Sequence, residues 1–172
     1  MILDRLIYCL TLPQRIEKTI MAKKIKTNAL RILDKHGVNY EAKSSSNAYT
    51  SENPDMDTSL IHKTLVARGS SNELFVFIIP LNNELDLKKA AIAAQEKKIL
   101  MIPEKELLQH TGYIKGGCSP IGMKKHYKTF LELSSIEMNQ LIVSGGKVSF
   151  RVKLQVSDLM QVVQAKAYDL VQ

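Results

Sequence analysis

The run LFVFII at residues 74–79 places six apolar side chains in succession. Successive side chains of a strand point to opposite faces, so an unbroken apolar run predicts a strand that is covered on both faces. The segment LIHKTLVARG before it has the composition of a strand too, and the polar residues GSSN between them indicate a turn. We therefore predict an antiparallel pair in a sheet that must carry helices or close on itself.

Caps and apolar spacing predict four helices. They are a helix from Thr27 or Asn28 to Gly37, residues 87–98 capped by Asp86, a helix with Pro103 in its first turn running through His110 to Gly112, and a last helix capped by Ser157. In the last helix we expect a core-facing stripe made of Leu159, Val162, Val163, Ala167 and Leu170.

Further strands are expected at residues 38–42 and at the buried run ILMI, residues 99–102. Residues 141–154 have the form of a hairpin, with Val148, Phe150, Val152 and Leu154 on one face and Ser149, Arg151 and Lys153 on the other. Residues 44–59 are polar without an apolar period, which predicts an exposed, mobile loop. The order of elements predicts an α/β fold: a mixed, curved, partly barrel-like β-sheet surrounded by helices, in a single domain.

The charge of the chain favours an anionic partner. There are 24 Lys and Arg against 17 Asp and Glu, a formal net charge of +7, which suits nucleic acid or a phosphorylated metabolite. No apolar run is long enough to cross a bilayer, so no membrane partner is expected. The two cysteines, Cys9 and Cys118, can build neither a disulfide framework nor a zinc cluster, and they fit a reducing cytoplasm.

The segment TGYIKGGCSPIGMKKH, residues 111–126, combines four glycines with three lysines. It is not a phosphate-binding P-loop, because that motif needs GxxxxGK followed by Ser or Thr. Exposed backbone N–H groups beside positive charge suit a substrate that brings both an anion and a carbonyl. An alternative is that Cys118 is a nucleophile with His126 or His62 as its base.

Four blocks in order, HKTLV (62–66), LDLKKAA (85–91), TGYIKGGCSPIGMKK (111–125) and IVSGGK (142–147), resemble the YbaK-like family of Cys-tRNA(Pro) deacylases. That family is related to the editing domain inserted in bacterial prolyl-tRNA synthetases. The resemblance begins at about Thr27 and predicts a deacylase domain over residues 23–172, with residues 1–22 as an N-terminal extension outside it.

The resemblance implies a trans-editing hydrolase that cleaves the ester of a mischarged aminoacyl-tRNA, with Cys-tRNA(Pro) as the expected substrate and the substrate's own thiol as the attacking group. It implies no metal and no cofactor. The catalytic residues implied are Lys63, Gly116 and Gly117. The substrate-binding residues implied are Thr64, Ser45 or in its place Tyr49, Cys118, Ser119, Pro120, Ser144, Gly145, Gly146, Lys147 and Arg151.

The tRNA-binding residues are expected to form a basic rim around the pocket: Lys88, Lys89, Lys115, Lys124, Lys125 and Lys128. The expected partners are the tRNA acceptor end and, as a candidate, prolyl-tRNA synthetase, with no DNA. Ser45, Arg151 and the short polar segment 44–60 depart from the family pattern. They favour an alternative, in which the chain is a catalytically weakened module of the same fold that binds tRNA or the synthetase.

Overall fold

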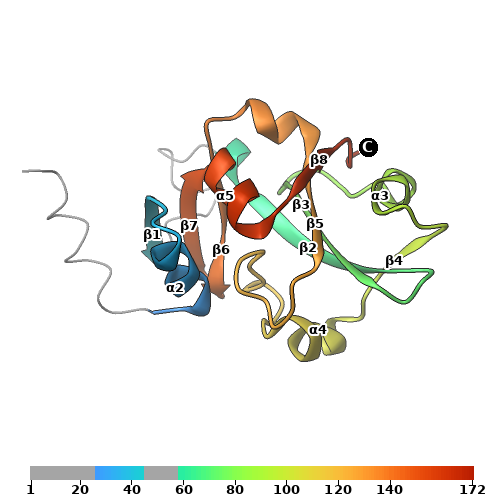
Figure 1. Cartoon of the computed structure of the whole chain (residues 1–172), viewed down its shortest axis with the longest axis horizontal. Coiled ribbons are helices and arrows are strands. Elements are labelled where there is room, and N and C mark those ends of the chain that lie inside the picture. The colour runs from blue at the N-terminus through green and yellow to red at the C-terminus, as the bar shows by residue number, and fades with distance from the viewer. Residues whose placement is uncertain (1–25, 45–57) are drawn as a thin grey trace, which may run out of the picture.

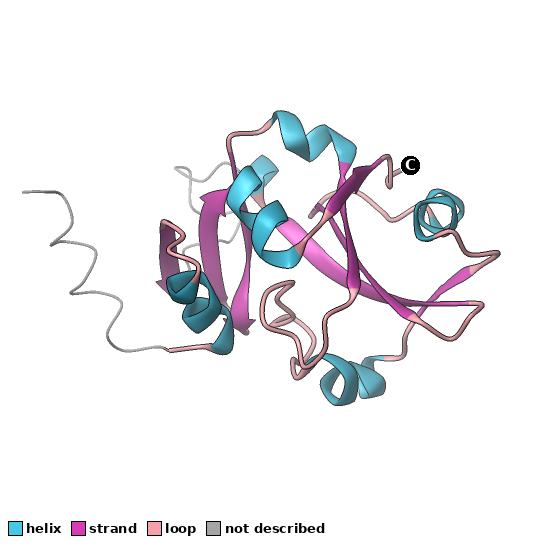
Figure 2. Ribbon diagram, viewed as in Figure 1, coloured by secondary structure: helices cyan, strands magenta, loops and turns pink. Residues whose placement is uncertain are grey.

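The computed structural model describes residues 26–44 and 58–172. These residues form a mixed α/β fold of two sheets with helices packed around them (Figures 1 and 2). The predicted extension 1–22 and most of the predicted loop 44–59 lie outside the described residues. Within the described part of the chain, no helix is long and apolar enough to cross a membrane.

The larger sheet has the strand order β4-β2-β3-β5-β8. Its strands are β2 (His62–Gly69), β3 (Leu74–Pro80), β4 (Ile99–Met101), β5 (Lys128–Glu132) and β8 (Lys166–Tyr168). β2 and β3 are antiparallel, as predicted, while β5 is parallel to both β3 and β8. All five residues from Phe75 to Ile79 are buried, which confirms that this strand is covered on both faces.

The smaller sheet has the order β1-β7-β6, formed by β1 (Tyr40–Ser44), β6 (Gln140–Lys147) and β7 (Phe150–Gln155). The predicted hairpin is β6–β7, and one isolated bridge between Ile61 and Ile142 joins it to the larger sheet. The curved sheet is therefore divided in two and does not close into a barrel.

Within the described residues, four α-helices cover the sheets: α2 (Asn28–Lys35), α3 (Leu87–Ala94), α4 (Glu104–Thr111) and α5 (Val156–Val163). The short 3-10 helices η2 (Thr58–Leu60) and η3 (Leu133–Glu137) lie in connections. The Thr27 side chain caps α2 and Asp86 caps α3, as predicted. Gly112 ends α4 in a left-handed conformation, also as predicted.

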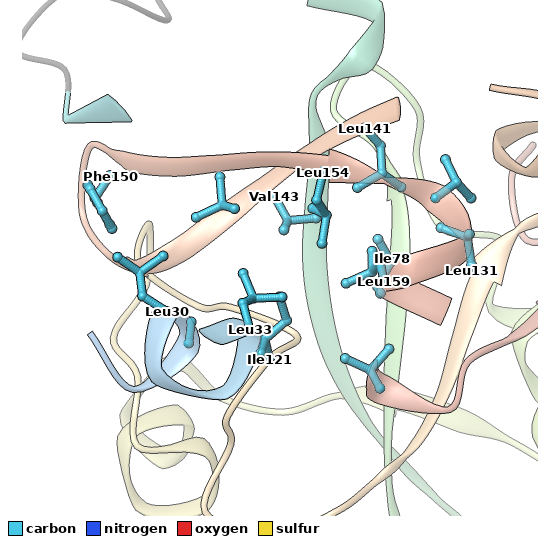
Figure 3. Packing of buried hydrophobic residues seen from close by; sticks show 14 residues of the cluster. Leu30, Leu33, Ile78, Ile121, Leu131, Leu141, Val143, Phe150, Leu154 and Leu159 are labelled. Atoms are coloured by element: carbon cyan, nitrogen blue, oxygen red, sulfur yellow. The ribbon is translucent and has the colours of Figure 1, made fainter. Parts of the chain in front are cut away.

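The main core lies between α2, α5 and both sheets. It includes Leu30, Leu33, Ile78, Leu131, Val143, Leu154 and Leu159, which point toward one another from four strands and two helices (Figure 3). A second cluster packs the alanines of α3 against Phe75, Phe77 and Phe130, and the rings of Phe77 and Phe130 are stacked at 5.4 Å. Figure 1 shows α2 and α3 at opposite ends of the molecule.

Several predicted boundaries are wrong. The first strand begins at Tyr40, and the Ala-rich helix ends at Ala94, because Gln95 adopts a left-handed conformation. The last helix begins at Val156 directly after β7, so Ser157 lies inside it and does not cap it. It ends where Gln164 turns left-handed, which places Ala167 in β8.

The strand β5 was missed, and Val148 does not face the core. Val148 and Ser149 form the turn between β6 and β7, since Lys147 pairs with Phe150, and the Val148 side chain is 54% exposed. Phe150, Val152 and Leu154 do share the buried face of the hairpin.

Candidate functional site

The main pocket lies beside the first half of β2. The edge strand β4 pairs only with Ala67, Arg68 and Gly69, so it leaves residues 62–65 of β2 without a strand partner on that side. The hairpin β6–β7 and the Gly-rich segment approach this uncovered edge and enclose a pocket of about 560 Å³. It is lined by Ile61, His62, Lys63, Thr64, Leu65, Leu81, Lys115, Gly116, Cys118, Ser144, Val148, Ser149, Phe150 and Arg151.

Eight residues that the sequence singled out come together here from three separate segments. They are His62, Lys63, Thr64, Lys115, Gly116, Cys118, Ser144 and Arg151. Ser45 and Tyr49 lie outside the described residues. The motifs HKT, GGCSP and SGGK, which are far apart in the sequence, therefore contribute to one pocket.

Gly117 does not line the pocket but packs against the tip of the hairpin β6–β7 next to it. A Cβ atom at Gly117 would lie 3.0 Å from the Lys147 carbonyl carbon and 3.0 Å from the Val148 nitrogen, so the Gly-rich segment and the hairpin tip are in direct backbone contact. The Gly117 N–H donates to the Ile114 carbonyl oxygen at 3.0 Å. The Gly117 N–H is therefore already hydrogen-bonded in this structure. Any oxyanion that binds in the pocket must accept hydrogen bonds from other N–H groups.

Other predicted substrate-binding residues also do not line the main pocket. Ser119 is fully buried, and its Oγ accepts a hydrogen bond from the Ile121 N–H. A Cβ at Gly145 would lie 2.6 Å from the Phe150 ring, and one at Gly146 would lie 3.0 Å from the Tyr113 ring. Both glycines are thus required by the packing of aromatic rings. Pro120 lines a neighbouring pocket, and Lys147 is exposed at the hairpin tip.

The main pocket is electropositive. Its lining includes Lys63, Lys115 and Arg151, and there is no Asp or Glu among the described residues that line it. Lys115 forms an exposed ion pair with Glu104 at 2.9 Å, which contributes little to stability. The side chain of the half-buried Lys63 makes no hydrogen bond or ion pair with any described residue. Its ammonium group is available to an anionic or carbonyl ligand.

Unpaired polar groups lie near this cation. The backbone N–H groups of Gly116 and Cys118 make no hydrogen bond within residues 26–44 and 58–172. The buried Thr64 Oγ1 likewise has no partner in the described part of the chain. Gly116 is exposed, so water can satisfy its N–H, whereas the buried Thr64 Oγ1 is a polar group that only a ligand or a bound water can complete. The pocket therefore has donors in place for an oxygen-rich ligand.

Cys118 and the two candidate histidines do not form a nucleophile–base pair. Burial raises the pKa of the Cys118 thiol to about 12, so the thiol is protonated at neutral pH. His62 Nε2 bonds Ser135 Oγ at 2.7 Å and its Nδ1 bonds the Leu60 carbonyl oxygen at 2.8 Å, while burial lowers its pKa. His126 lines other pockets. Neither imidazole has a nitrogen placed to accept the thiol proton.

The six predicted tRNA-binding lysines do not encircle the main pocket, since only Lys115 lines it. Lys89 on α3 donates to Asp169 at 2.8 Å and to the Val171 carbonyl oxygen at 2.6 Å, and Lys88 is exposed on the same helix. Lys124 donates to the Gln109 carbonyl oxygen. Lys125 and Lys128 line two further pockets, which are described below.

Sequence reasoning missed part of the pocket wall: Ile61, Leu65, Leu81, Val148, Ser149 and Phe150. Most are apolar side chains that local patterning assigns to the core. Ser149 adopts a left-handed conformation with φ 57°, for which its serine side chain gives no signal. No group of three or more His, Cys, Asp or Glu side chains in the described ranges is arranged to hold a metal ion.

The chain is similar to several known proteins. A relative from Enterococcus faecalis, named "Putative Cys-tRNA(Pro)/Cys-tRNA(Cys) deacylase EbsC", is 41% identical over 144 residues, covering 78% of this chain and 88% of the relative. A crystal structure of "a putative trans-editing enzyme for prolyl tRNA synthetase" has a TM-score of 0.73 at 20% identity, covering 86% of this chain and 99% of that chain. A crystal structure of a hypothetical protein has a TM-score of 0.77 at 15% identity, covering 85% of this chain and all of that chain (100%).

The two solved structures share the fold. The model of the aminoacyl-tRNA editing domain matches residues 42–162, which include the uncovered half of β2, the Gly-rich segment and the hairpin. Together with the identity to the E. faecalis relative, this match assigns the protein to a family: the chain belongs to the aminoacyl-tRNA editing domain family.

Proposed function

We propose that this protein is a trans-editing deacylase, which hydrolyses the ester bond of a mischarged aminoacyl-tRNA. One observation carries the proposal: an unpaired lysine, Lys63, lies in the same acid-free pocket as the free N–H groups of Gly116 and Cys118. The substrate brings a phosphodiester anion and an ester carbonyl at its 3′ end, and the pocket offers a cation for the first and N–H donors for the second.

Cys-tRNA(Pro) is the proposed substrate. The 41% identical relative is named for Cys-tRNA(Pro) and Cys-tRNA(Cys), and the fold and motifs are those expected for such an enzyme. The cysteinyl thiol of the substrate attacks its own carbonyl carbon, the bond to the ribose oxygen breaks, and the thiol proton ends on the released tRNA hydroxyl. The cyclic thiolactone formed then takes up water to give free cysteine.

In this mechanism the protein supplies orientation and charge. The N–H groups of Gly116 and Cys118 bind the carbonyl oxygen as it becomes an oxyanion, and Lys63 holds the terminal nucleotide. Cys118 remains a neutral thiol in the wall and takes no part in bond making. Ser144 and Arg151 on the hairpin line the side of the pocket that lies across from β2.

The test is deacylation of purified Cys-tRNA(Pro) by the wild type, Lys63→Ala and Cys118→Ala, with the exposed Lys97→Ala as a matched charge control. We expect Lys63→Ala to reduce the rate by about 10²-fold or more, and the other two variants to retain it. Ser-tRNA, which lacks the thiol, should turn over far more slowly. Loss of activity in Cys118→Ala with retention in Lys63→Ala would overturn the assignment.

Turnover by none of the proteins, together with intact tRNA binding, would instead support the weakened binding module. Prolyl-tRNA synthetase is a proposed partner, because editing in trans must intercept the mischarged tRNA near the enzyme that made it. Sedimentation of the two proteins with and without tRNA tests this association. The same reaction would place the protein in the cytoplasm.

A further inference from the structure

Two smaller pockets adjoin each other beyond the Gly-rich segment. One, of about 290 Å³, lies between the end of α2, residues 120–129 and the end of α5. The other, of about 270 Å³, lies between the end of α3, the start of β5 and β8. Both are lined by His126 and Thr129, so the two pockets lie side by side, and together we call them the basic trough.

The lining of the trough carries positive charge and no described Asp or Glu. Its basic side chains are Lys35, His36, Lys125, His126, Lys128 and Lys166, and all six residues are exposed. Lys128 is 3.2 Å from Glu73 in an exposed ion pair, which water and salt weaken. Like charges gathered along a groove repel one another unless an anion binds there.

The trough and the main pocket are two sides of the same chain segment. Gly116 and Cys118 line the main pocket, whereas Pro120, Gly122 and Lys125 line the trough. The segment between them is held in place: the Asn28 amide donates to the Gly122 carbonyl oxygen at 2.7 Å, and the Tyr113 hydroxyl donates to the Ile121 carbonyl oxygen at 2.7 Å. The main pocket and the trough share no lining residue, so a ligand must pass around this segment to contact both, as a molecule the size of a tRNA can.

We infer that the basic trough binds the phosphate backbone of the tRNA acceptor arm while the 3′ end occupies the main pocket. This inference rests on the proposed function. The lysines that contact RNA in this binding mode differ from those predicted from the sequence. Lys125 and Lys128 are retained, and Lys35 and Lys166 are added. Lys88 and Lys89 on α3 do not contact RNA. Phosphate contacts carry no base specificity, so the trough reads shape and charge.

There is a competing explanation for the same charges. The helices α2, α3 and α5 all end at the trough, and lysines near helix C-termini offset the partial negative charge of the helix. On that account the lysines stabilise the fold, and their removal would lower the melting temperature without changing tRNA affinity. The experiment therefore measures both.

The test compares two triple variants that lose the same charge from exposed positions. Lys35→Ala/Lys125→Ala/Lys166→Ala removes three of the four lysines of the trough, and Lys88→Ala/Lys97→Ala/Lys105→Ala changes lysines that line neither the main pocket nor the trough. Binding of deacylated tRNA(Pro) is measured over a series of salt concentrations. The affinity falls as salt rises, and each phosphate contact contributes about 0.7 to 0.9 to the steepness of log K against log salt. We expect the trough variant, which loses three contacts, to have a slope that is shallower by about 2 to 3. The control variant should keep the wild-type slope.

Equal slopes for both variants would overturn the inference, as would a trough variant that binds tRNA normally but melts earlier. A trough variant that keeps tRNA affinity but loses prolyl-tRNA synthetase would also overturn it, and would assign the trough to an acidic protein surface. Hydrolysis of 3′-cysteinyl-adenosine, which has the ester but no acceptor arm, tests the proposed chemistry independently of the trough. If the wild type does not cleave that ester, the proposed chemistry fails whatever the trough binds.

Discussion

Among single residues, Cys118 makes the free energy of unfolding depend on pH in a known direction. Burial raises the pKa of its thiol from 9.0 to about 12, so the folded protein keeps the proton at pH values where the unfolded chain releases it. The stabilisation is complete below about pH 9 and is lost as pH rises toward 12. Tyr40 and Tyr113, whose pKa values burial raises to about 12, act in the same direction.

We therefore predict that the free energy of unfolding falls between about pH 8 and about pH 10.5, and that it falls less steeply in Cys118→Ala. Urea unfolding at several pH values measures both slopes. The comparison uses the slopes, because the substitution also removes packing in the wall. Parallel curves for the two proteins would contradict the prediction.

The residues of the site were predicted unevenly. Lys63, Thr64 and Gly116 could be identified because they lie in the segments HKTLV and TGYIKGGCSPIGMKK, which resemble motifs of the deacylase family. Leu81 and Phe150 could not, since an apolar side chain looks the same in a sequence whether it faces a core or a pocket. Gly145 and Gly146 belong to the right motif, but their packing against Phe150 and Tyr113 is visible only in three dimensions.

At the level of elements, the contact between the hairpin β6–β7 and the Gly-rich segment sets the geometry of the pocket. We predict that Gly117→Ala lowers the deacylation rate by about 10²-fold, because the new methyl group would push the segment off the Lys147–Val148 backbone and displace the N–H groups beside it. Single-turnover kinetics on Cys-tRNA(Pro) measures the rate.

Gly37→Ala is the control for this variant. Gly37 has a positive φ of 67°, unlike Gly117, and no atom within 4 Å of its added Cβ. The Gly37→Ala substitution should therefore cost about 1 to 2 kcal/mol of stability through backbone strain and leave the rate unchanged. A wild-type rate in Gly117→Ala would mean that the contact does not position the site.

The strand β5 holds the larger sheet together from its interior, between β3 and β8. We predict that Leu131→Ala lowers the free energy of unfolding by about 2 to 5 kcal/mol, since Leu131 is completely buried in the main core. Leu133→Ala, two residues later and 46% exposed, should change it by about 0.5 kcal/mol or less. Urea denaturation measures both, and similar losses would contradict the role given to β5.

The elements that could be predicted are those with local signals. The antiparallel pair β2–β3 has a polar turn, α3 has Asp86 as a cap, and α4 has Gly112 at its end. The strand β5 has no such signal: it is five residues long and pairs in parallel with strands far away in the sequence. The end of α5 was also missed, because glutamine rather than glycine takes the left-handed conformation at Gln164.

For the molecule as a whole, residues 1–20 are predicted to be dispensable. The family model begins at residue 42, and the first described helix is capped by Thr27 itself. Removal of residues 1–20 should leave the melting temperature and the deacylation rate unchanged. A lower melting temperature would show instead that Leu6, Ile7 and Leu10 pack on the core.

The separation of the basic trough from the ester-binding pocket has a consequence for turnover. On the proposed binding mode, the trough touches parts of the tRNA that are identical before and after the ester is cleaved. Such contacts bind substrate and product equally, so they raise occupancy without lowering the chemical barrier. Uncharged tRNA then competes with mischarged tRNA for the same surface, and the enzyme is inhibited by its own product, most strongly at low salt.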